Sequence, residues 1–173
     1  MGKDIKLMLA ALGFAILLIF GFAIWQSRSP DSQDNESVEV AGVQITGIEA
    51  EPESYDLGDV PINGGLITKE YKVKNTSGDI LKLKKIATSC MCTKAKVKVG
   101  DKETKLFGME GHGDKNPPVN VEIPAGELAL VTAIFDPAAH GPQGVGPIDR
   151  SVFLTFSDPA GTKELRFKGT VTN

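Results

Sequence analysis

The sequence has 173 residues, 41% of them hydrophobic, and a formal net charge of −3. Residues 1–28 carry three basic side chains and one acidic one, which leaves a net charge of −5 on the remainder. An acidic domain lacks the basic face through which proteins displace counterions from nucleic acid, so no nucleic acid is expected as a partner. The chain has only two cysteines, which excludes a small fold held together by several disulfides.

The first predicted element is a transmembrane helix over residues 7–25, from Leu7 to Trp25. These residues contain no charged side chain and no polar stripe, and at about 1.5 Å per residue they match the ~30 Å hydrocarbon layer of a bilayer. Trp25 stands where indole rings favour the membrane–water interface. The sequence therefore predicts a single-pass anchor whose partner is the lipid bilayer.

The charges beside this segment predict its orientation. Lys3 and Lys6 precede it, whereas Arg28 is followed closely by several acidic residues. Because positive charge is retained inside, residues 1–6 form a short cytoplasmic tail and the domain lies outside, in the periplasm or at the cell surface. The alternative is a cleaved signal peptide with small residues near 21–23, which also places the domain outside the cytoplasm.

Residues 26–42 are rich in Ser, Asp, Gln, Asn and Glu, and this composition predicts a flexible linker. Residues 43–173 alternate between apolar and polar side chains, the period of half-buried strands. The lysines of these strands occupy the polar phase, where lysine usually faces solvent. The predicted strands lie at 71–74, 81–84, 95–99, 119–123 and 152–156, and the turns that separate them at 63–65, 75–79, 124–126, 136–137 and 158–161.

This pattern predicts an all-β, immunoglobulin-like two-sheet sandwich of about eight strands, preceded by the transmembrane helix. An ordered series of motifs resembles the bacterial DUF1573 domains, which are similar to the ASH/MSP immunoglobulin-like group. The motifs are Tyr55-Asp56-Leu57-Gly58-Asp59-Val60, Tyr71-x-Val73-x-Asn75-Thr76-Ser77-Gly78, Leu81-x-Leu83, Ile86-Ala87-Thr88-Ser89-Cys90-Met91-Cys92-Thr93, Pro124-Ala125-Gly126-Glu127, Ile134-Phe135-Asp136-Pro137, Gly141 and Phe167-Lys168-Gly169-Thr170-Val171.

The resemblance spans residues 50–171 and implies a binding or scaffolding module. Two departures stand out: Met91 replaces the glycine that the family usually has between its cysteines, and residues 100–118 look like an insertion. Loops of that length in compact domains tend to be functional or disordered, so we expect a binding loop there or, with equal weight, a tolerated insertion.

The pair Cys90 and Cys92 is the one motif that suggests chemistry. On an extended strand their Cα atoms would lie roughly 6–7 Å apart, so a disulfide between them needs a bend. Three interpretations stay open. The cysteines are structural, either buried apolar groups or a local disulfide. They bind copper or zinc, with ligands drawn from Met91, Met109, His112 and His140. Or they exchange disulfides, although their spacing is shorter than Cys-x-x-Cys.

No Gly-x-Ser-x-Gly, Walker or His-Glu-x-x-His motif occurs, so we expect no enzyme. The predicted function is a non-catalytic binding or scaffold module of the cell envelope. Its expected partner is another envelope protein or a surface polymer. The alternatives are metal binding and, less favoured, thiol–disulfide exchange.

Overall fold

The computed structural model describes residues 43–113 and 115–173. The predicted tail at 1–6, anchor at 7–25 and linker at 26–42 lie outside these residues. Within the described part of the chain, no helix is long and apolar enough to cross a membrane.

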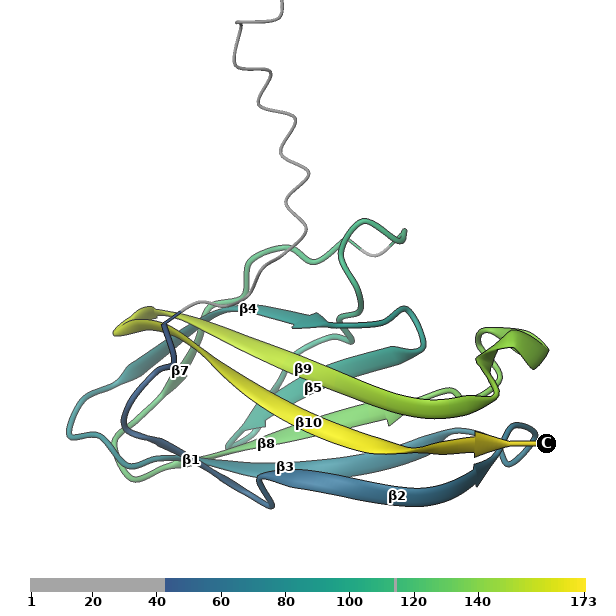
Figure 1. The fold of residues 1–173 in the computed structure, drawn as a ribbon. Helices are drawn as coiled ribbons and strands as arrows, with labels where there is room; N and C mark the ends of the chain where they lie inside the picture. The colour runs from purple at the N-terminus through teal and green to yellow at the C-terminus, as the bar shows by residue number, and fades with distance from the viewer. Residues whose placement is uncertain (1–42, 114) are drawn as a thin grey trace, which may run out of the picture. The chain divides into compact units, whose positions relative to one another are not determined.

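Ten strands form two five-stranded sheets that pack face to face (Figure 1). In the first sheet the order is β1 (Ile48–Glu51), β3 (Ile67–Asn75), β8 (Leu128–Phe135), β5 (Thr93–Val99) and β6 (Lys102–Glu103). In the second sheet it is β2 (Ser54–Pro61), β10 (Ala160–Thr172), β9 (Gly146–Asp158), β4 (Leu81–Thr88) and β7 (Val121–Ile123). All pairs are antiparallel except β2 with β10. The immunoglobulin-like sandwich is thus confirmed, with a short 3-10 turn at Gly141–Gly144 (η1) as the one helical element of the described residues.

Alternation along each strand explains how the core forms. In β3, Tyr71 and Val73 are fully buried while Lys72 and Lys74 between them are exposed. The same phase in β4 buries both leucines and exposes Lys82 and Lys84, so the predicted solvent face of the lysines is confirmed there. Fully burying such apolar side chains stabilises the fold by about 1.5–3 kcal/mol each.

A partly buried hydrogen bond of Tyr71 joins the two sheets. The Tyr71 hydroxyl of β3 donates to the carbonyl of Arg166 on β10 over 2.8 Å. Burial, with Tyr55 as a smaller cause, raises the pKa of the Tyr71 phenol above its ordinary value. The neutral phenol is therefore the form that the folded domain favours.

The strands predicted at 71–74, 81–84, 95–99 and 152–156 are all longer in the structure, as β3, β4, β5 and β9. Two further boundaries also differ. The strand predicted at 119–123 is shorter in the structure, because β7 begins at Val121. Val119 lies before the strand but donates its N–H to the Lys84 carbonyl over 2.8 Å. The turn expected at 158–161 is tighter, because β9 continues to Asp158 and β10 begins at Ala160. These two long strands form the hairpin that runs across Figure 1.

Candidate functional site

Cys90 and Cys92 lie in the turn through which the chain passes from β4 in the second sheet to β5 in the first. The Thr88 hydroxyl, at the end of β4, lies 3.0 Å from the carbonyls of both Cys90 and Thr93, and the Thr93 N–H donates to Cys90 O over 3.0 Å. The cysteines are therefore not on an extended strand. Their Cα atoms lie 5.2 Å apart, closer than strand geometry predicts, because the turn supplies the bend.

In this structure the sulfurs of Cys90 and Cys92 are bonded to each other. Both residues are buried, at 8% and 3% exposure, whereas Met91 between them is 45% exposed. The Cys92 N–H also points at Cys90 Sγ over 3.3 Å. The bridge thus belongs to the edge of the core and has one solvent-facing residue at its tip.

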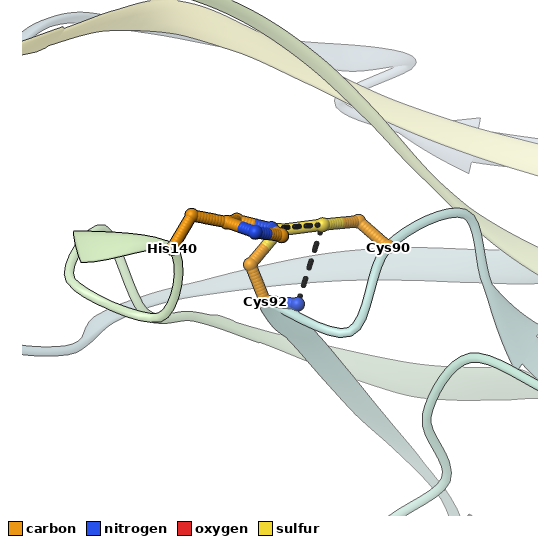
Figure 2. Close-up of side chains that lie close together, drawn as sticks. All are labelled: Cys90, Cys92 and His140. Carbon is orange, nitrogen blue, oxygen red and sulfur yellow. Dashed lines mark hydrogen bonds between the residues drawn. A yellow bond between two sulfur atoms is a disulfide. The ribbon is translucent and has the colours of Figure 1, made fainter. Parts of the chain in front are cut away.

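His140 approaches the bridge from a second turn, which follows β8 (Figure 2). Its Nε2 lies 3.2 Å from Cys90 Sγ, although the residue as a whole is exposed. The two turns are held together because Asp136 donates its N–H to the Cys92 carbonyl over 2.8 Å. The imidazole of His140 is thereby held beside Cys90, although the two residues are 50 positions apart in the sequence.

Arg150 of β9 contacts the other sulfur. Its Nε donates to Cys92 Sγ over 3.3 Å, and its Nη1 donates to the Asp149 carbonyl over 2.9 Å. The guanidinium is half-buried and always charged, so it places a permanent positive charge beside Cys92 Sγ. Arg150 is not among the residues predicted for the site, because no local motif around it indicates such a role.

The predicted metal ligands are only partly brought together. Within the described residues, the one group of three or more His, Cys, Asp or Glu side chains with metal-ligand spacing consists of Cys90, Cys92 and His140, whose ligand atoms lie within 4.8 Å of one another. His112 does not join this group; it is exposed, with Nδ1 3.3 Å from the Glu110 carbonyl. Met109 is half-buried, in a segment held beside β4 by the Lys85–Glu110 ion pair.

The segment 100–118 is folded onto the domain. Phe107 is only 2% exposed and joins the core, and its N–H and carbonyl pair with Ala95 of β5 over 2.8 Å in each direction. The Asn116 side chain closes a loop by donating to the Gly108 carbonyl over 2.7 Å. This segment therefore contributes a core side chain, which a merely tolerated insertion would not need to do.

A groove of about 610 Å³ lies between β7, an edge of the second sheet, and the end of β5 with β6, an edge of the first. It is lined by three lysines, three acidic residues, one asparagine and a few apolar or small residues, with no histidine or cysteine. They are Lys82, Leu83, Lys84, Val99, Gly100, Asp101, Lys102, Asn120, Val121, Glu122, Pro124 and Glu127.

Comparison with known proteins finds a family match over residues 48–111, to a protein of unknown function (DUF1573). The match contains the cysteine motif and ends inside the segment 100–118, so the motifs at 124–127, 134–137 and 167–171 lie beyond it. No curated protein matches the chain.

Similar solved structures include a protein of unknown function from Porphyromonas gingivalis, at 18% identity and a TM-score of 0.49, with 75% of this chain covered. The chain spans 47% of that protein. The ASH/PapD-like domain of human CEP192 is 16% identical, with 74% of this chain and 87% of that one covered and a TM-score of 0.42. A C. elegans MSP family member is 12% identical over 74% of this chain and 100% of that one, with a TM-score of 0.34.

The resemblance that the motifs indicate is confirmed over residues 48–111, which match the model of the DUF1573 family, a protein family of unknown function.

Proposed function

We propose that this domain is a non-catalytic binding module of the cell envelope, held outside the cytoplasm by a single membrane anchor at residues 7–25. Its location is supported by the bond between Cys90 and Cys92, because disulfides persist mainly in oxidising compartments outside the cytoplasm. The flanking charges give the same orientation, with Lys3 and Lys6 on the cytoplasmic side.

The observation that carries the binding function is the groove beside β7. Among the strands that the structure describes, β7 is the last of its sheet and pairs only with β4, so its outer edge has main-chain groups that an added strand can pair with. Apolar side chains of the groove next to it, including Val121 and Pro124, can contact every second side chain of an extended segment bound there.

The charges of the groove favour a polypeptide partner over an anionic polymer. Its three lysines are offset by three acidic residues, and two of the lysines already have partners: Lys82 pairs with Asp158 at 3.2 Å and Lys84 donates to Asn120 at 2.8 Å. A site without net charge gives little attraction to a polyanion. The proposed partner is therefore an extended segment of another envelope protein.

In-cell photocrosslinking tests this function. A photoreactive amino acid replaces Glu122, which is exposed on β7, and in a matched variant it replaces Lys168, which is exposed on β10 and does not line the groove. We expect a discrete protein adduct from position 122 alone. Adducts with a carbohydrate polymer would assign the surface-polymer alternative, and equal patterns from the two positions would reject the groove as the binding surface.

The location has a separate test. Protease added to cells with a permeable outer layer and an intact inner membrane should digest residues 43–173 while leaving the anchor in the membrane. A domain that stays protected until the membrane is dissolved would place it in the cytoplasm and overturn the proposed orientation.

A further inference from the structure

We infer that reduction of the Cys90–Cys92 bond creates a three-coordinate site for Cu(I), in which the two thiolates and Nε2 of His140 are the ligands. None of these residues lines the groove, so the inference goes beyond the binding function and does not depend on it. Figure 2 shows the three side chains converging from two turns.

In the disulfide form, His140 already lies at about the distance from the sulfurs that a bound ion requires, whereas the two bonded sulfurs must move apart. With about 2.3 Å from metal to sulfur and about 2.0 Å from metal to nitrogen, trigonal ligands stand roughly 4 Å from one another. Nε2 of His140 lies 3.2 Å from Cys90 Sγ, and all three ligand atoms fall within 4.8 Å. Once the sulfurs separate, rotation of the side chains is enough to surround an ion, without movement of the backbone.

The backbone that holds the ligands is fixed by contacts that reduction leaves intact. The Asp136 N–H still donates to the Cys92 carbonyl, and the Thr88 hydroxyl still contacts the Cys90 carbonyl. His140 sits closely over Gly144, where an added Cβ would lie 3.0 Å from His140 Cβ. A pre-positioned imidazole loses less freedom on binding an ion than a mobile one does.

Ligand type, ligand number and charge all favour Cu(I) over zinc. Thiolates are soft ligands that select Cu(I), whereas a structural zinc site usually has four protein ligands, and among the described His, Cys, Asp and Glu side chains three converge here. Two thiolates and Cu(I) leave one negative charge, which the guanidinium of Arg150 at Cys92 Sγ neutralises. With Zn²⁺ the same set would be neutral, which leaves the positive charge of that guanidinium uncompensated.

The bound state requires two balanced steps. A dithiol reductant gives two electrons and two protons to the bridge, becomes a disulfide itself, and leaves thiols on Cys90 and Cys92. Cu(I) then displaces both thiol protons as it binds the two sulfurs. The disulfide form lacks the thiolates, so the oxidation state of the pair decides whether the site binds the ion.

The test is an anaerobic competition for Cu(I) between the full-length chain in detergent and the chromogenic chelator bicinchoninate. The chain is first reduced with dithiothreitol and freed of the reductant. We expect one Cu(I) per reduced chain and none for the oxidised chain. X-ray absorption of the loaded wild-type chain should show two sulfur scatterers and one nitrogen scatterer, a result that depends on no variant.

Variants identify the ligands. His140→Ala should weaken Cu(I) binding at least tenfold, Cys90→Ser with Cys92→Ser should abolish it, and His112→Ala, the matched histidine control, should leave it unchanged. Gly144→Ala should weaken it as well, because the added methyl group displaces the imidazole without removing it.

Four results would overturn the inference. Reduced protein that loses Cu(I) to the chelator and instead reacts with oxidised glutathione would assign thiol–disulfide exchange. Equal affinities of His140→Ala and His112→Ala, or two sulfur scatterers without nitrogen, would remove His140 from the site. Retention of zinc in the presence of equal Cu(I) would reject copper as the metal.

Discussion

The Arg150 guanidinium donates from Nε to Cys92 Sγ over 3.3 Å and so joins the long strand β9 to the turn that carries the cysteine pair. A hydrogen bond from a cation strengthens when its acceptor becomes a thiolate. The contact therefore stabilises the reduced state of the pair more than the disulfide.

Arg150→Gln should make the reduction potential of the pair more negative. Losing a charge-assisted bond worth about 1.5–3 kcal/mol corresponds to roughly 30–60 mV for a two-electron couple. The measurement is the free-thiol fraction at equilibrium across a series of dithiothreitol ratios. Lys168→Gln removes the same charge from an exposed site beside Asp56 and should change nothing. A potential that rises in Arg150→Gln would contradict the role of the guanidinium.

We predict that the hydrogen bonds of the Asn75 side chain contribute strongly to the stability of the sandwich. Asn75 is fully buried, its Nδ2 donates to the carbonyls of Asp79 and Ile123 over 2.8 Å each, and its Oδ1 accepts from the Ser77 N–H over 2.9 Å. Asn75→Ala should lower the free energy of unfolding by about 2–4 kcal/mol, because the buried bond to the Ile123 carbonyl and the partly buried bonds to Asp79 and Ser77 are all lost.

Urea unfolding of the full chain, followed by circular dichroism, measures this loss. Asn75→Asp keeps the volume of the side chain but removes both donors, so it should be destabilised similarly. Asn120→Ala, at an exposed asparagine, should stay within about 0.5 kcal/mol of the wild type. Full stability of Asn75→Asp would show that the side chain's volume, rather than its donors, matters.

The strands could be predicted from the sequence because their signal is local. In β3, Tyr71 and Val73 alternate with Lys72 and Lys74, and a period of two fixes both the secondary structure and the buried face. The two cysteines were equally visible as a candidate site. The distance between the two cysteines could not be predicted in the same way. The spacing of an extended strand does not apply to them, because they lie in the turn between β4 and β5.

The rest of the candidate site could not be predicted, because strand pairing and not sequence spacing creates it. His140 and Arg150 stand 50 and 58 residues from their sulfurs, in segments with ordinary turn and strand patterns. Likewise Phe107 is flanked by Leu106 and Gly108 without any alternation, and only its pairing with Ala95 makes it a core residue.

The buried phenol of Tyr71 predicts a stability loss at high pH. Because its pKa is raised in the folded state, its favourable contribution is complete below the unfolded value of about 10 and is lost as the pH rises above that value. Tyr71→Phe should cost about 1 kcal/mol at pH 8, from the lost bond to Arg166 O, but its stability should fall less steeply above pH 10.

Urea midpoints of both proteins at pH 8, 9, 10 and 10.5 test this dependence. The two proteins differ in no other side chain, so the difference between the two curves reports on Tyr71. Parallel curves across this range would mean that Tyr71 ionises as readily in the folded chain as in the unfolded one.

The buried ring of Phe107 predicts that the segment 100–118 contributes to the stability of the domain. This ring is buried at 2% exposure, while the adjacent Leu106 is 50% exposed. Phe107→Ala should therefore cost about 3–5 kcal/mol of stability, whereas Leu106→Ala should change it by about 0.5 kcal/mol or less. Thermal unfolding of the two variants measures the contrast. Equal, small effects would mean that the segment separates from the domain without loss, and such a result would restore the interpretation of a tolerated insertion.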